Sequence, residues 1–293
     1  MLFSRAMLVG VLLGLGASAS WAVANVAVQR SARAVGPFRG LLWAQVVGAL
    51  VVSFAIPFEP RGAPFTPLDA VWVAAVGAAG LLAYVSLFYA FEHGRLTVAV
   101  PIMSSWAVIA AALSLAIFSE PVRPLQLVGA GGVVAGAVVV SRFAHATTAA
   151  ATPDGGSPRW LLAAFGAALG FGLMIPLIGL LTPVTGRLGV IPVAYGADIA
   201  LGLPLALRFG VSLAPPRGRQ WLPVALAGVF ETAGFVCIVL AGRFAPLALV
   251  SPLSSLASAF TVAFAWAFLR ERPARPVVVG AALVCAGVVT LAL

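Results

Sequence analysis

Ten apolar segments, each close to the length that crosses a bilayer, make up almost the whole chain. A helix needs about 20 apolar residues to span the hydrocarbon core of a membrane. The breaks between the segments are rich in arginine, proline and glycine, which are typical of turns. The expected spans are residues 6–28, 38–58, 69–91, 96–118, 124–143, 160–181, 189–209, 220–241, 246–268 and 275–293.

Composition excludes a water-soluble fold. Hydrophobic residues make up 62% of the chain and charged residues only 9%, too many apolar side chains for one soluble core. The first apolar run continues through Val28, which is longer than the core of a secretory signal. We therefore predict an all-α, multi-pass membrane protein whose surroundings are a lipid bilayer.

One stretch of the chain occurs twice. Residues 101–140 align without a gap on residues 252–291, and 12 of the 40 positions are identical. A composition of this kind would give roughly four or five identities by chance. The identical pairs include Pro101 and Pro252, Ser104 and Ser255, Glu120 and Glu271, Gly129 and Gly280, and Gly136 and Gly287. This pattern indicates a duplicated helical hairpin.

The duplication extends to whole halves of the chain. The longest polar insertion lies at the midpoint, so we expect a first repeat at 1–145, a linker at 146–159 and a second repeat at 160–293. Each repeat contains five spans. An odd number of crossings makes the second repeat enter the membrane from the opposite side, which predicts inverted repeats around a central cavity, as in many secondary transporters.

The sequence resembles the EamA domain of the drug/metabolite transporter superfamily. The resemblance rests on the motif Phe88-Tyr89-Ala90, the small and polar residues 99–105, Ser119-Glu120, and the glycine-rich 129–136. A second copy of the later elements lies at 245–255, Arg270-Glu271 and 280–287. Trp106 and Ala257 depart from the family pattern, which often has proline there.

The resemblance implies a ten-helix secondary transporter of small metabolites and no enzyme. Family members move amino acids, nucleotide sugars or organic cations, and the bacterial ten-helix members are mostly amino-acid exporters of the inner membrane. We therefore expect amino-acid export by alternating access, with multidrug or nucleotide-sugar transport as alternatives. An intramembrane lipid-modifying enzyme is a further alternative, but it would need more deep carboxylates or histidines than this chain offers. The sequence predicts neither cofactor, metal nor nucleic-acid partner, and leaves monomer and homodimer open.

Two acidic residues lie deep within expected spans. Asp198 is near the middle of the seventh and Glu231 near the middle of the eighth. An ionisable group in hydrocarbon is costly unless it faces a cavity or a partner. We predict that they bind a substrate ammonium group or a coupling proton, although a purely structural role stays open.

Other polar and aromatic residues within the spans are candidates for the cavity wall. Tyrosine and tryptophan carry a polar group that needs a partner when buried. Serines beside a helix proline can either bond a freed carbonyl or face a substrate. The candidates are Trp21, Asn25, Tyr84, Phe88, Tyr89, Ser104, Trp106, Tyr195, Ser254 and Ser255, with Pro101 and Pro252 as hinges.

The basic residues give a prediction of topology. All 17 are arginine. Twelve lie in the turns after the first, third, fifth, seventh and ninth spans, and five lie on the side of the termini. The positive-inside rule then places both termini outside the cytoplasm.

Overall fold

The computed structural model describes residues 5–54, 56–58, 62–118, 123–148, 159–244, 253, 256–269 and 273–291, and their regular structure is entirely helical. The helices are α1 (Arg5–Val35), α2 (Pro37–Ser53), α3 (Pro67–His93), α4 (Leu96–Met103), α5 (Trp106–Phe118), α6 (Pro124–Thr148), α7 (Arg159–Thr185), α8 (Val190–Arg208), α9 (Trp221–Ala241), α11 (Ala257–Leu269) and α12 (Arg275–Leu291), with short 3₁₀ turns η1 (Ile56–Phe58) and η2 (Gly218–Gln220).

The predicted ten-helix membrane fold is confirmed. Within the described residues, seven helical stretches are long and apolar enough to cross a membrane, and three shorter apolar helices complete the ten. One of the seven, Leu96–Leu113, combines α4 with the first part of α5.

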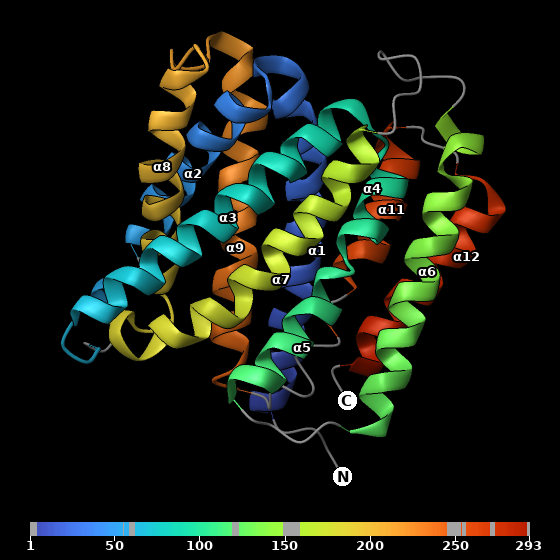
Figure 1. Cartoon of the computed structure of the whole chain (residues 1–293), viewed down its shortest axis with the longest axis horizontal. Coiled ribbons are helices and arrows are strands. Elements are labelled where there is room, and N and C mark those ends of the chain that lie inside the picture. The colour runs from blue at the N-terminus through green and yellow to red at the C-terminus, as the bar shows by residue number, and fades with distance from the viewer. Residues whose placement is uncertain are drawn as a thin grey trace.

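The helices pack as two inverted repeats, α1 to α6 and α7 to α12. Helix α1 packs on α9 in the way that its counterpart α7 packs on α3, and α2 packs on α9 as α8 packs on α3. The pairs α2 with α8 and α6 with α12 join equivalent helices directly. Figure 1 shows α1, α3, α7 and α9 at the centre of the bundle. The equivalent contacts indicate a pseudo-two-fold axis between the repeats.

Helices α6 and α12 form a pair at one edge of the bundle (Figure 1). Gly136 lies against the backbone of Gly280, and Gly287 lies against the backbone of Gly129. Because the contacts run in opposite directions along the chain, the two helices are antiparallel. Glycine lets helix backbones approach closely in membranes, where hydrophobicity alone gives no drive to associate. Val133, Ala137, Val284 and Val288 form a small core of their own between the two helices, whereas Val140 and Val277 belong to the main core of the molecule.

The first helix is longer than its apolar run. We expected it to end at Val28, but it continues to Val35 and includes Arg30 and Arg33. Arginine is a good helix former, so charge alone does not end a helix. The chain turns instead at Gly36, whose φ of 84° suits glycine, and Pro37 begins α2.

The fourth span is broken between α4 and α5. Helix α4 contains Pro101 and ends at Met103, and α5 begins at Trp106. Within the break, the Ser104 hydroxyl donates to the Val100 carbonyl at 2.9 Å and the Ser105 hydroxyl to the Ile102 carbonyl at 2.7 Å. These hydroxyls therefore bond the local backbone, one of the two roles expected for them.

Candidate functional site

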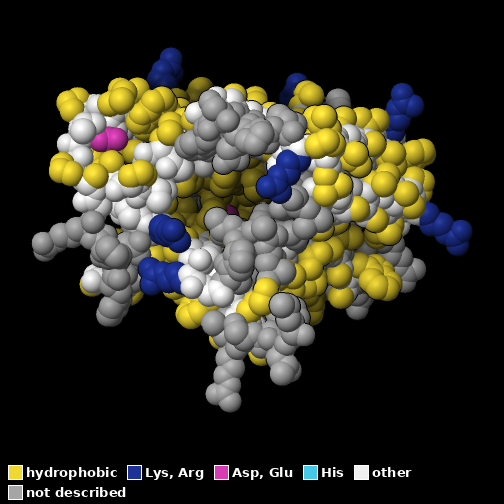
Figure 2. All heavy atoms as spheres, turned by 90° about the horizontal axis from the view of Figure 1, so that it is seen from below, with side chains coloured by type: hydrophobic (Ala, Val, Ile, Leu, Met, Phe, Trp, Pro, Cys, Tyr) yellow, Lys and Arg dark blue, Asp and Glu magenta, His cyan; other side chains and the backbone are white. Residues whose placement is uncertain are grey.

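A cavity of about 750 Å³ lies between the two repeats. Its walls come from α1, α3, α4, α5, α7, α8, α9, α11 and α12 among the described helices, so both repeats contribute. Figure 2 shows a hollow on the face where α1 begins and α12 ends, with an acidic side chain visible in its depth. This volume is in the range typical of sites for small molecules.

Most of the candidate residues that the structure describes line this cavity. They are Trp21, Asn25, Tyr84, Ser104, Trp106, Tyr195, Asp198 and Glu231. Phe88 instead lines a neighbouring pocket of about 20 Å³. Tyr89 lines neither, and its ring stacks on His93. Pro101 is buried in α4, while Ser254, Ser255 and Pro252 lie outside the described residues.

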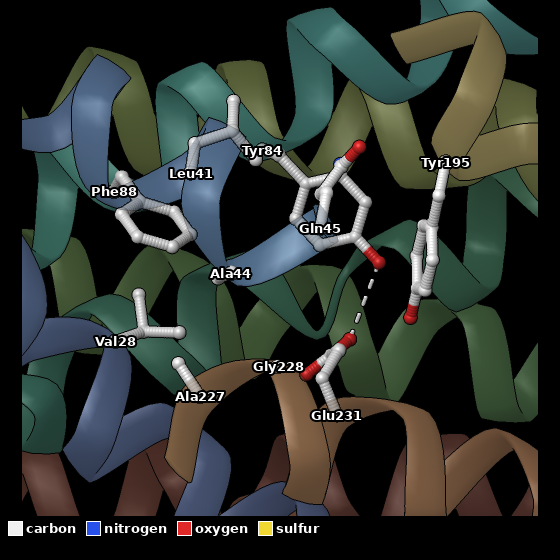
Figure 3. Close-up of a pocket in the computed structure, with 10 residues that line it drawn as sticks. All are labelled: Val28, Leu41, Ala44, Gln45, Tyr84, Phe88, Tyr195, Ala227, Gly228 and Glu231. Carbon is white, nitrogen blue, oxygen red and sulfur yellow. Dashed lines mark hydrogen bonds between the residues drawn. The ribbon is translucent and has the colours of Figure 1, made fainter. Parts of the chain in front are cut away.

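Glu231 projects from the middle of α9 toward α3. The Tyr84 hydroxyl donates to its Oε1 at 3.3 Å, and both residues also line the neighbouring small pocket (Figure 3). The indole N–H of Trp21 donates to the Glu231 backbone carbonyl at 3.2 Å and so fixes α1 against the same turn of α9. The carboxylate is partly exposed to the cavity, which leaves it accessible to a ligand.

Asp198 projects from α8 and is more enclosed than Glu231, with only 1% of its surface exposed. Its Oδ2 accepts a hydrogen bond of 2.8 Å from the side-chain amide of Gln45 on α2. On the other side it lies against Gly80 of α3, where an added Cβ would come within 2.4 Å of Oδ1. The absence of a side chain at Gly80 therefore leaves the space that the Asp198 carboxylate occupies.

Polar contacts between helices surround the two acids. The Tyr195 hydroxyl lies 3.2 Å from the Thr232 hydroxyl, which joins α8 to α9. The Asn25 amide donates to the Thr261 hydroxyl at 3.0 Å, which joins α1 to α11. The hydroxyls of Ser104 and Ser258 are also in contact, and join α4 to α11. The last two of these contacts join the two repeats beside the cavity, and the first joins two helices of the second repeat.

The rest of the wall is mainly apolar and aromatic. Helix α7 contributes one face, and the ring of Phe171 packs edge-on against Tyr84 with centroids 5.0 Å apart. Phe235 of α9 packs edge-on against Trp21. Arg187, between α7 and α8, also lines the cavity.

Sequence reasoning missed three parts of this site. The α7 stripe of Phe171, Met174, Ile175 and Ile178 has helical spacing, but ordinary core packing gives the same pattern. Arg187 was assigned only to topology. Gln45 carried a usable signal, because an amide in the middle of an apolar span needs a partner. Among the described residues, no cluster of three or more His, Cys, Asp or Glu could hold a metal.

The close contact at Gly80 gives a first prediction. Replacing Gly80 by alanine should displace the Asp198 carboxylate and lower stability by about 1–3 kcal/mol, the usual cost of overpacking. Thermal unfolding of the purified protein in detergent measures the change. Gly196→Ala is the matched control, because a Cβ there meets nothing within 4 Å. Equal unfolding temperatures for both variants would contradict the tight contact.

Comparison with known proteins identifies the family. The EamA-like transporter family matches residues 8–142 and again residues 158–293, so one domain occurs twice and together the two copies cover nearly the whole chain. The chain belongs to the EamA-like transporter family. Members of this family are transporters of small molecules.

A solved structure supports the fold of this EamA-like transporter. A chain described as "Crystal structure of protein" superposes with a TM-score of 0.64 over 96% of this chain and 95% of its own length. The two sequences are 19% identical, so the similarity concerns the fold alone. No curated protein matches the sequence.

Proposed function

We propose that this EamA-like transporter exports amino acids with apolar side chains across the inner membrane by alternating access. The observation that carries the proposal is the composition of the cavity. Glu231 offers a carboxylate for an ammonium group, and the aromatic residues Trp106, Phe171 and Phe235 offer a surface for an apolar side chain. Buried charge-assisted bonds fix the orientation of a ligand, while apolar contact area provides much of its affinity.

The charges of the cavity favour this class over nucleotide sugars. Asp198 and Glu231 both lie in its depth, where they would repel a diphosphate. Arg187 lines the same cavity and supplies a positive charge that can attract a carboxylate. An organic cation is the second candidate, because two acids and several aromatic rings also suit a cation.

The opening of the cavity indicates which side of the membrane this conformation faces. It lies on the side of the chain termini, to which the order of the spans in the sequence assigns five arginines, whereas it assigns twelve to the opposite side. By the positive-inside rule, this cavity opens away from the cytoplasm. For alternating access, we propose that the break after Pro101 and the equivalent region near Pro252 act as hinges.

Counterflow in proteoliposomes tests the proposal. Vesicles loaded with unlabelled L-phenylalanine should accumulate labelled L-phenylalanine from outside, and empty liposomes should not. The same vesicles should take up labelled L-leucine well, a nucleotide sugar poorly, and labelled tetraphenylphosphonium poorly if amino acids are the substrates. Exchange of tetraphenylphosphonium without exchange of any amino acid would establish the second candidate instead.

A further inference from the structure

The pair Asp198 and Gln45 has a feature that substrate binding at Glu231 does not explain. Both side chains are buried, with 1% and 4% of their surfaces exposed. One hydrogen bond joins them, from the Gln45 Nε2 to the Asp198 Oδ2. Asp198 Oδ1 and Gln45 Oε1 are also buried, and no described residue donates a hydrogen bond to either. These two oxygens are both hydrogen-bond acceptors, and the described residues supply no donor for either of them.

Charge makes the arrangement more unusual. Among the described residues, no arginine or histidine forms an ion pair with Asp198. A carboxylate within the membrane normally pairs with a cation or a proton, because its desolvation is costly. The titratable groups that line the cavity with it are Tyr84 from α3, Tyr195 from its own helix, Glu231 from α9 and Cys285 from α12. The basic residue of the described lining, Arg187, comes before α8 and forms no ion pair with Asp198. Gly80 of α3 and Gln45 of α2 complete the contacts.

Glutamine can serve both protonation states of a neighbouring carboxyl group. Its N–H donates to a carboxylate, as observed at 2.8 Å. After rotation of the amide by half a turn, its oxygen accepts from the O–H of a carboxylic acid. Gln45 can therefore stay hydrogen-bonded to Asp198 whether the Asp198 carboxyl group is ionised or protonated.

We propose that Asp198, held by Gln45, is a proton-binding site that couples proton movement to transport. The proton comes from water in the cavity, binds one Asp198 oxygen, and leaves again to water on the opposite side after the cavity has reoriented. Glu231 binds the substrate ammonium group, so one acid binds the substrate and the other binds the proton. The coupling to a substrate rests on the proposed function, whereas proton binding at Asp198 does not depend on it.

Separate sites for the proton and the substrate predict that the two move in opposite directions across the membrane. Protonation of Asp198 removes one negative charge from the cavity and so weakens the attraction for a bound ammonium group. Loss of the proton restores that attraction. A proton moving inward would thus promote release of a substrate moving outward, and the site needs no other energy source.

Infrared difference spectra test the proton site without any substrate. Spectra of the membrane-reconstituted protein, recorded between acidic and alkaline pH, should contain the carbonyl band of a carboxylic acid. The other carboxyl groups of the chain contribute to the same region, so Asp198→Asn should remove one component of the band, whereas Glu231→Gln should keep that component. Gln45→Leu should shift it, because the carboxyl group loses its hydrogen-bond partner. Gln29→Leu is the matched control, since Gln29 is equally buried but bonds the Gly94 backbone and does not line the cavity.

Proton flux tests the coupling. Proteoliposomes with a pH-sensitive dye inside should show a pH change when a gradient of L-phenylalanine is applied, and Asp198→Asn should abolish the pH change while keeping counterflow. A carbonyl region that Asp198→Asn leaves unchanged, or wild-type counterflow that needs Na⁺ and moves no proton, would overturn the inference and leave the proposed function intact. If Asp198→Asn loses its component of the band but no amino acid shows counterflow, the proposed function is contradicted and the assignment of the proton site stands.

Discussion

Replacing Glu231 by glutamine should raise the half-saturating concentration of L-phenylalanine in counterflow by about 10- to 100-fold. A hydrogen bond to a charged group contributes about 1.5–3 kcal/mol, and each 1.4 kcal/mol corresponds to a factor of ten. Glutamine keeps the shape and can still bond Tyr84, which lies 3.3 Å from the carboxylate. The loss should therefore reflect the charge and not the packing.

The matched control for this change is Glu92→Gln. Glu92 is at the end of α3, beside His93, and lines neither cavity. Its variant should transport as the wild type does. Normal affinity in Glu231→Gln together with a large loss in Asp198→Asn would contradict our assignment, because the ammonium group would then bind at Asp198.

The second large effect is expected at the contact between α6 and α12. A Cβ at position 136 would come within 2.6 Å of the Gly280 carbonyl oxygen and 2.7 Å of the Val284 amide nitrogen. These are backbone atoms, so the helices themselves would have to separate. Gly136→Ala should therefore lower stability by about 1–3 kcal/mol, measured by thermal unfolding in detergent.

Gly131→Ala, on the same helix, separates this effect from helix propensity. A Cβ at position 131 meets nothing within 4 Å, and alanine is favoured over glycine in a helix by about 1 kcal/mol. This variant should be as stable as the wild type or more stable. If both alanine variants unfold at the same temperature, the close approach of α6 and α12 contributes little to stability.

Much of the fold followed from the sequence, because membrane helices are specified by length and apolarity. The ten spans, the two repeats and their inversion were all predicted from segment lengths and from the duplicated hairpin. Helix ends were less predictable. Helix α1 continues past the end of its apolar run to Val35, because arginine does not oppose helix formation. It ends only at Gly36 and Pro37.

The candidate site was predictable only in part. Deep acids such as Asp198 and Glu231 are recognisable because their burial is costly. The apolar wall on α7 is not, since Phe171 or Ile178 would look the same in a packed core. The bond between Gln45 and Asp198 joins residues 153 apart in the chain, and a single sequence does not indicate which buried amide meets which acid.

The contact between Tyr84 and Glu231 also shows what a single chain can do that a symmetric pair cannot. The two residues come from equivalent helices of the two repeats, α3 and α9, and their side chains meet between the repeats. If each repeat were a separate, identical subunit, the same acid would enter the cavity from both sides, and two carboxylates in one site oppose each other's ionisation. Joining the repeats in one polypeptide lets one side carry the acid and the other a phenol, so the cavity can hold a carboxylate at its centre without a second one against it.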